Sequence, residues 1–115
     1  GQGEHDLALL AWTSDNGDPD NFFTPNLACA AVEGGGNKSR WCDKGFDKLL
    51  DEARRLTDAK TRTALYKQAQ RMVYDELPVL TLVYPVSFDG ASKRLQGYLP
   101  SPFGYSDFRA VSVAP

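Results

Sequence analysis

DKGFDKLLDEARRL, residues 43 to 56, carries the apolar spacing that decides the local fold. Its apolar residues recur at i, i+3, i+4, i+7 and i+10, namely Phe46, Leu49, Leu50, Ala53 and Leu56. This spacing is the stripe of an amphipathic helix that buries one face. Asp43 is a suitable N-cap, because its carboxylate can accept a hydrogen bond from an amide of the first turn. The stretch therefore predicts a helix that begins after Asp43.

A second helix follows almost at once. Asp58 is a candidate N-cap, and the predicted apolar face consists of Leu65, Ala69, Met72, Val73 and Leu77. Pro78 lacks an amide hydrogen and disfavours a helical conformation at the residue before it. We expect this helix to stop at Leu77 and to form a short-linked pair with the first.

Apolar runs on both sides of the helical pair predict strands. LALLAW, residues 7 to 12, has the length and near-continuous apolarity of a central strand covered on both faces. VLTLVYPVSF, residues 79 to 88, is β-branched and aromatic but is interrupted by Pro85. Short strands are expected within residues 94–98 and 108–113. The tail after residue 88 has too few apolar residues for a core of its own, so we expect it to pack on the first 85 residues or on another domain.

Composition limits the possible functions. The 115 residues are 42% hydrophobic and 24% charged, with a net charge of −2. A chain of this size can build one modest core, and it has no basic excess that would attract nucleic acid or an anionic membrane. No apolar run approaches the roughly 20 residues needed to cross a bilayer. The opening GQGEHD has neither an initiator Met nor a signal-like pattern, which leads us to expect a cut, processed or engineered start and a piece of a larger protein.

The chain has two cysteines, Cys29 and Cys42, in a segment rich in Gly, Asn and Ser. A disulfide between them would clamp this segment and would indicate an oxidising compartment such as a bacterial periplasm. Two reduced, partly buried thiols are the alternative. A metal site is the least favoured interpretation, because the spacing matches no zinc pattern and His5 is the sole histidine.

WTSDNGDPDN, residues 12 to 21, concentrates acidic, amide and turn-forming residues. Neither frame that starts at Asp15 or Asn16 places oxygen ligands, Gly and Glu as a calcium loop needs them. Hydrolysis by paired carboxylates would need a second acidic cluster across a cleft, and a nucleophile would need a positioned base. The glycine run at residues 34–36 lacks a Lys, Ser or Thr at phosphate-loop spacing. We therefore expect neither a metal nor an enzyme active site.

Recognition of a ligand remains as the functional interpretation of this stretch. A carboxylate at the end of a strand, shielded by Trp12, suits a ligand ammonium group, because a charge-assisted hydrogen bond is strong where water is excluded. The free backbone groups of the strand could pair with an extended peptide. The alternative is structural: Asp15 only caps a turn and Trp12 only fills a core.

Five strings of the sequence carry a family resemblance: LALLAWTSDNGDPDNFF, CAAVEGGGNKSRWC, FDKLLDEARRLTD, RTALYKQAQ and YLPSPFGYSDF. Together they resemble the C-terminal part of bacterial extracellular solute-binding proteins of the peptide ABC-transporter class (family 5), most of all the periplasmic dipeptide-binding members. The resemblance implies an α/β periplasmic-binding-protein-like lobe, with a helical pair packed on a mixed sheet, within a two-lobe fold. Residues 1–85 would be the C-terminal part of lobe 2, and residues 86–115 a tail that returns to lobe 1.

The same resemblance implies a function and a set of site residues. It predicts the substrate-binding component of an ABC peptide importer, which binds di- or short peptides in the periplasm without cofactor or chemistry. Asp15 would pair with the α-amino group of the ligand, Ala11 and Thr13 with its backbone, and Trp12 would border a side-chain pocket. Asp18 and Asp20 are left as turn residues. The family pattern also implies a disulfide between Cys29 and Cys42.

The expected partners follow from the resemblance. They are a short peptide, an ABC transporter permease and the N-terminal portion of the same protein, which would supply the basic residue for the ligand carboxylate. Lys38 and Arg40 are expected to be solvated surface rather than substitutes for that residue. Two alternatives stay open: a stand-alone protein-interaction module in which Asp15 is structural, and a relative that binds haem, glutathione or a nickel complex.

Overall fold

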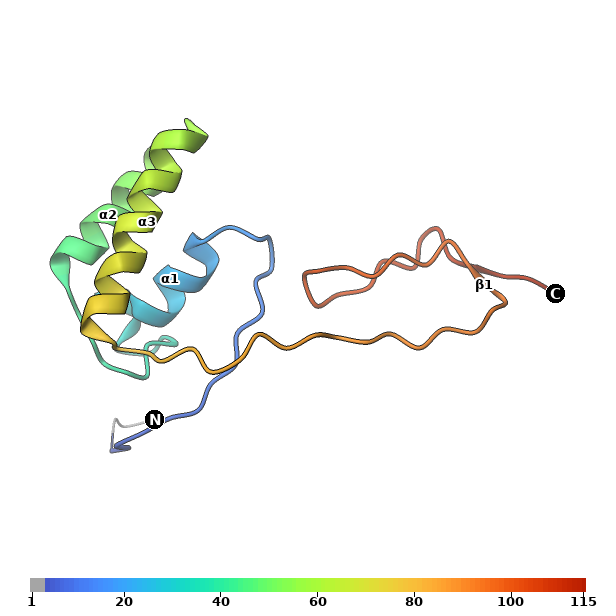
Figure 1. Ribbon diagram of the computed structural model, residues 1–115, viewed down its shortest axis with the longest axis horizontal. Coiled ribbons are helices and arrows are strands. Elements are labelled where there is room, and N and C mark those ends of the chain that lie inside the picture. The colour runs from blue at the N-terminus through green and yellow to red at the C-terminus, as the bar shows by residue number, and fades with distance from the viewer. Residues whose placement is uncertain (1–3) are drawn as a thin grey trace.

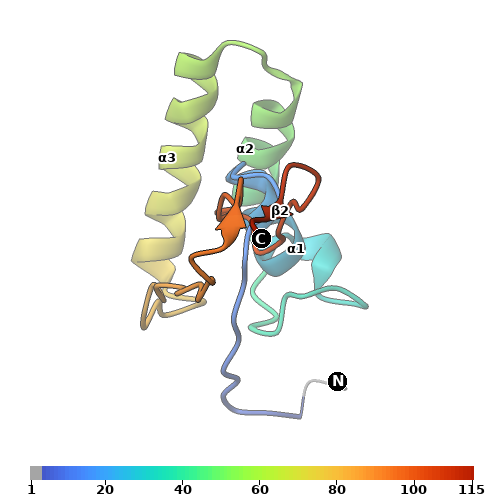
Figure 2. The same cartoon turned by 90° about the vertical axis from the view of Figure 1, so that its right-hand side faces the viewer.

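A computed structural model describes residues 4–115, and its most regular part is the expected helical pair. Helix α2 (Lys44–Arg55) and helix α3 (Ala59–Glu76) run side by side, as Figures 1 and 2 show. Both predicted N-caps are confirmed: Asp43 accepts a hydrogen bond from the amide of Phe46 at 2.7 Å, and Asp58 accepts one from the amide of Thr61 at 2.7 Å.

Helix α3 ends at Glu76, just before Pro78, as the sequence predicted. Leu77 caps it in the left-handed conformation, with φ of 50°. That turn leads the chain away from the helix, so Leu77 is 61% exposed rather than part of the apolar face as expected. Tyr66, which the apolar pattern did not include, is buried instead.

Helix α1 (Asp20–Leu27) was not expected, because residues 12 to 21 are rich in turn-forming residues and no apolar helix pattern follows them. The side chain of Asp18 accepts a hydrogen bond from the amide of Asp20 at 2.9 Å and so starts the helix. The far end is buried, with Leu27 0% exposed. A short 3₁₀ turn, η1 (Cys29–Ala31), follows α1.

The three helices share one small core. Its buried members are Leu27, Ala28, Phe46, Leu50, Ala53, Leu65, Tyr66 and Ala69. The centre is aromatic: the ring centroid of Phe46 lies 5.7 Å from that of Phe23 and 4.9 Å from that of Trp41, both edge to face. These contacts fix α1 and the chain before α2 against the helical pair.

A disulfide joins Cys29 to Cys42 and closes the loop between η1 and α2. Inside the loop, the buried amide of Asn37 donates to the carbonyl oxygens of Ala28 and Trp41, at 3.1 and 2.8 Å. The disulfide that the resemblance implied is therefore present. The disulfide and the hydrogen bonds of Asn37 together hold the loop in place.

Much of the chain outside the helices and the disulfide loop has no regular secondary structure. Residues 7–12 and 79–88, both expected to be strands, have extended backbones but pair with no strand among the residues that the structure describes. The sheet observed in residues 4–115 is a two-stranded antiparallel one, formed by β1 (Leu95–Gln96) and β2 (Ser112–Val113). Both strands fall within the short segments expected for the tail. Figure 1 shows β1 and β2 reaching away from the helices, so the helical pair does not pack on this sheet within residues 4–115.

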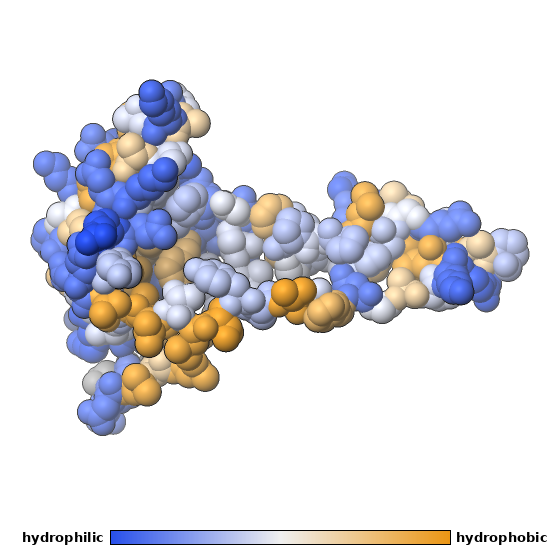
Figure 3. Space-filling model, viewed as in Figure 1, coloured by the Kyte–Doolittle hydropathy of each residue, from blue (hydrophilic) through white to orange (hydrophobic). Residues whose placement is uncertain are grey.

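Large apolar side chains are exposed along both extended segments, and Figure 3 shows hydrophobic surface along the lower edge of the molecule. Leu7, Leu9, Leu80, Val83, Tyr84 and Phe88 are all more than 70% exposed. The radius of gyration is 18.3 Å, whereas a compact domain near this length has about 13 Å. Outside the helical core, residues 4–115 leave much of the apolar surface of this chain uncovered.

Candidate functional site

Asp15 lies at the bend where the extended N-terminal segment turns toward α1. Short side chains hold this bend through a series of local hydrogen bonds. The hydroxyl of Ser14 accepts from the amide of Gly17 at 2.8 Å, and the side-chain oxygen of Asn16 accepts from the amide of Asp18 at 2.9 Å. Gly17 has φ of 73°, a left-handed conformation that glycine adopts without strain. The turn-forming residues of the sequence therefore build a defined loop.

The carboxylate of Asp15 is exposed and is contacted from α1. The side-chain amide of Asn21 donates to Oδ2 of Asp15 at 3.2 Å, and its oxygen accepts from the backbone amide of Asp15 at 3.0 Å. Within residues 4–115, Oδ1 of Asp15 has no hydrogen-bond partner. One carboxylate oxygen is thus held in place and the other is open to solvent.

The three residues expected beside Asp15 lie in the extended segment. Ala11, Trp12 and Thr13 are exposed, with Trp12 43% exposed. The backbone groups of Ala11 and Thr13 form no hydrogen bond to any of the described residues. Such groups are available to an extended partner, because strand addition needs unpaired amide and carbonyl groups.

The C-terminal tail lies close to Thr13 and to the Asp15 loop at two glycines, Gly104 in the tail and Gly17 in the loop. A methyl group added at Gly104 would lie 3.1 Å from Cγ2 of Thr13, and one added at Gly17 would lie 3.2 Å from the ring of Phe103. Residues 103–104 therefore lie beside the loop that carries Asp15. No pattern in the sequence indicated this contact, because it joins segments that are remote along the chain.

Asp18 and Asp20 do more than form a turn. Oδ2 of Asp18 lies 2.7 Å from Nη2 of Arg62 on α3, and Oδ1 of Asp20 accepts from the hydroxyl of Thr24 at 2.7 Å. Hydrogen bonding to Asp18 raises the pKa of the Arg62 guanidinium above its ordinary value, because the carboxylate stabilises the charged form. Arg62 also donates to the carbonyl oxygen of Ala53 at 3.1 Å. Sequence reasoning missed Arg62, because nothing in the spacing pairs it with Asp18.

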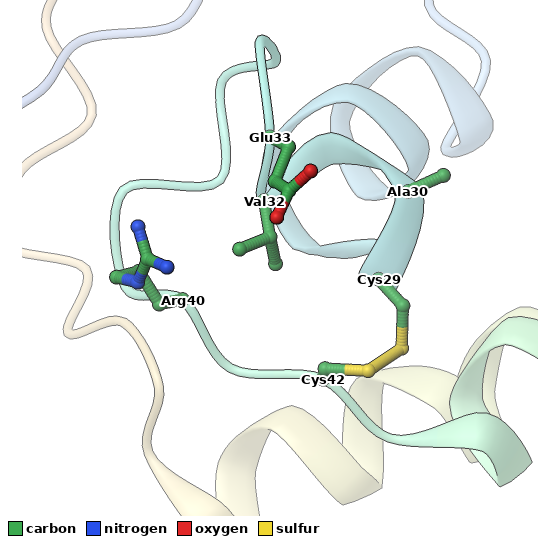
Figure 4. Close-up of a pocket in the computed structure, with 6 residues that line it drawn as sticks. All are labelled: Cys29, Ala30, Val32, Glu33, Arg40 and Cys42. Carbon is green, nitrogen blue, oxygen red and sulfur yellow. A yellow bond between two sulfur atoms is a disulfide. The ribbon is translucent and has the colours of Figure 1, made fainter. Parts of the chain in front are cut away.

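Lys38 and Arg40 belong to the disulfide loop. Nζ of Lys38 donates to the carbonyl oxygen of Gly35 at 2.9 Å, within the same loop. Arg40 is exposed and borders an open hollow of about 310 Å³, which Figure 4 shows. Its lining residues are Cys29, Ala30, Val32, Glu33, Arg40 and Cys42. Both cations thus have surface positions in the loop.

The structure shows no metal-binding arrangement in the part that it describes. Among residues 4–115, no three or more His, Cys, Asp or Glu side chains gather as they would around a metal ion. His5 instead lies with Nε2 2.9 Å from the carbonyl oxygen of Lys38. None of the helices in residues 4–115 is long and apolar enough to cross a membrane.

Comparison with known proteins identifies the relatives of the chain. No protein-family model matches it. It is 50% identical over 111 residues to di/tripeptide-binding protein 2 of Pseudomonas aeruginosa and 43% identical over 111 residues to the dipeptide-binding protein of Escherichia coli. It is also 43% identical over 112 residues to heme-binding protein A of Haemophilus influenzae. These matches cover 96–97% of this chain but 20–21% of each relative, so the chain spans about a fifth of their length.

Solved structures give the same result. A dipeptide-binding protein from Pseudoalteromonas in complex with Met-Leu matches with a TM-score of 0.78 and 35% identity, over 89% of this chain and 20% of that one. The periplasmic binding protein DppA from Helicobacter pylori in complex with the peptide STSA matches with a TM-score of 0.78 and 31% identity, over 90% and 21% of the two chains. The expected resemblance and the α/β fold class are therefore confirmed. The chain is thus similar over nearly all of its length to part of di/tripeptide-binding, dipeptide-binding and heme-binding proteins.

Proposed function

We propose, from this homology to periplasmic di/tripeptide-binding proteins, that the chain is the C-terminal part of the substrate-binding component of an ABC peptide importer. In the complete protein it would bind di- or short peptides in the periplasm and deliver them to the permease, with no chemical step. The observation that carries the proposal is the exposed Asp15 carboxylate next to unpaired backbone, in a chain 43–50% identical to di/tripeptide-binding proteins.

Asp15 would bind the α-amino group of the peptide through its open oxygen. Ammonium and carboxylate groups form charge-assisted hydrogen bonds, which are about twice as strong as neutral ones. The unpaired backbone of Ala11 and Thr13 would add hydrogen bonds that are independent of the peptide sequence, and Trp12 would border a side-chain pocket. This arrangement selects a free amino terminus while it tolerates different side chains.

The rest of the same protein would cover the exposed apolar surface. Residues 1–85 would belong to the second lobe and residues 86–115 would return to the first lobe, so that residues 7–12 and 79–88 gain strand partners from elsewhere in the protein. The exposure of Leu7, Leu80 and Phe88 supports this assignment, because soluble monomers rarely leave such contiguous apolar surface in water. The basic group for the ligand carboxylate would also come from that portion.

This arrangement makes a prediction for the 115-residue chain by itself. Expressed alone, it should bind an apolar dye such as ANS and self-associate in sedimentation experiments. A folded monomer that binds no dye would instead favour a stand-alone interaction module in which Asp15 is structural.

The ligand class is tested by calorimetric titration of the complete protein with di- and tripeptides and, separately, with haem. Haem is the relevant competitor, because one relative with 43% identity is a heme-binding protein. Peptide binding without haem binding would support the proposal. Haem binding without peptide binding would contradict it.

A further inference from the structure

Asn21, in the first turn of α1, contacts Asp15 at two points. Its side-chain oxygen accepts from the backbone amide of Asp15 at 3.0 Å, and its side-chain nitrogen donates to the Asp15 carboxylate at 3.2 Å. Both distances are within or at the edge of the normal hydrogen-bond range. A carboxamide side chain can do both, because it carries a donor and an acceptor on one planar group. These two bonds fix both the backbone and the side chain of Asp15.

The helix that carries Asn21 is itself anchored to the core. Leu27 at its far end is fully buried, and the ring of Phe23 packs edge to face on that of Phe46. Asp15, by contrast, lies in an exposed loop. Asn21 therefore links an exposed carboxylate to a part of the molecule whose position is set by packing.

We propose that Asn21 is a positioning residue for peptide binding, which acts through Asp15 and does not itself touch the ligand. The inference rests on the proposed function, in which Asp15 binds the ligand amine. Asn21 occupies Oδ2 and thereby directs Oδ1, which has no partner among residues 4–115, toward the ligand. An exposed aspartate samples several rotamers, and binding must then fix one of them. Pre-ordering by Asn21 reduces that entropic cost.

The test measures the dissociation constant of a dipeptide with a free amino terminus for four forms of the complete protein. These are the wild type, Asp15→Ala, Asn21→Ala and the double variant. We expect Asn21→Ala to weaken binding about tenfold, since a hydrogen bond to a charged group is lost. In the Asp15→Ala background the same change should alter affinity less than about twofold, because residues that act through one another are non-additive.

Asn26 provides the matched control on the same helix. Its side chain donates to the carbonyl oxygen of Phe22 at 2.9 Å, and among residues 4–115 it forms no hydrogen bond with the loop around Asp15. Asn26→Ala should leave peptide affinity within about twofold of the wild type. Melting temperatures identify variants that are unfolded, and Asn21→Leu, which keeps a similar side-chain shape, replaces Asn21→Ala if the latter does not fold.

The outcomes separate the inference from the proposed function. If Asp15→Ala weakens binding strongly while Asn21→Ala behaves like Asn26→Ala, the positioning role is wrong and the proposed function stands. If the effects of Asp15→Ala and Asn21→Ala simply add, Asn21 acts by another route and the inference is again overturned. If Asp15→Ala itself leaves the affinity unchanged, the role proposed for Asp15 is wrong.

Discussion

Asp18 and Arg62 are 44 residues apart in sequence, and their side chains form an ion pair with an N–O distance of 2.7 Å. The pair joins the loop that carries Asp15 to helix α3. Asp18 also accepts from the amide of Asp20, so the same carboxylate starts α1 and ties it to the helical pair. The position of the candidate site thus depends on a contact between an acidic turn residue and a helix face.

Replacement of Arg62 by Ala should loosen this attachment. The change removes the ion pair, a hydrogen bond to the carbonyl oxygen of Ala53 and packing of the guanidinium on the Tyr66 ring, 4.9 Å from its centroid. We expect the complete protein to lose about 1–2 kcal/mol of unfolding free energy in urea, because the site is only partly exposed.

Arg71 is the matched control for Arg62, since it lies on the same helix in an exposed pair with Asp75. Arg71→Ala should cost less than about 0.5 kcal/mol, as is usual for exposed helix pairs. Equal losses for the two variants would show that the Asp18–Arg62 pair has no special role.

The N-cap of α3 predicts a pH dependence. Hydrogen bonds from the hydroxyl and amide of Thr61 lower the pKa of Asp58 below its ordinary value. The folded state therefore favours the ionised carboxylate, and the stabilisation is complete above the unfolded pKa of about 4 and is lost as the pH falls through the lower folded pKa.

Asp58→Asn removes this titration. The stability difference between wild type and variant should be constant from neutral pH to about pH 5 and should shrink below about pH 4. Urea unfolding at a series of pH values measures it, with Glu52→Gln as a control for the loss of one helix charge. A difference that grows toward acid pH would have the wrong sign for this interpretation.

The disulfide should stabilise the loop between η1 and α2. Replacement of both Cys29 and Cys42 by Ala should lower the unfolding free energy by about 3 kcal/mol, since the closed loop has a sequence separation of 13. Denaturant unfolding with and without reductant gives the measurement: the wild type should respond to reductant and the double variant should not. If reductant leaves the wild type unchanged, the bond is absent or contributes no stability.

The contact between the tail and the loop can be tested at Gly104. This residue has φ of 72°, and a Cβ there would lie 3.1 Å from the Thr13 methyl group. Gly104→Ala should therefore cost roughly 1 kcal/mol or more in stability and should weaken peptide binding, because the tail would move away from Thr13. Gly90→Ala is the control, since no described atom lies within 4 Å of its Cβ position and it does not require positive φ. Similar effects of the two changes would argue against the contact.

The sequence predicted best where local chemistry decides the structure. The helices α2 and α3, their caps at Asp43 and Asp58 and the stop before Pro78 depend on apolar spacing and capping within the segment. Helix α1 was missed, because its Asp, Asn and Pro residues favour turns and its helix depends on tertiary contacts such as Phe23 with Phe46. Residues 7–12 have the apolarity of a strand, but a strand also needs a partner, and residues 4–115 offer none.

The candidate site was predicted in part. Asp15 could be identified from its place in WTSDNGDPDN and from the family resemblance. Its contact with Asn21 could not be predicted from the sequence. The two residues are six positions apart, a separation that places side chains together in neither a regular helix nor a strand. That contact arises only when the bend at Gly17 returns the chain toward the start of α1.

The most direct test of the central claim, that Asp15 binds the peptide amine, compares two ligands with two forms of the complete protein. Calorimetry would measure the affinities of a dipeptide and of its N-acetylated form for the wild type and for Asp15→Ala. In the complete protein the rest of the chain would cover the Asp15–amine pair. We therefore expect the wild type to prefer the free amine by about a hundredfold or more, since a buried charge that loses its partner costs about 3–5 kcal/mol. Asp15→Ala should lose most of that preference. Equal affinity of the wild type for the two ligands would contradict the claim.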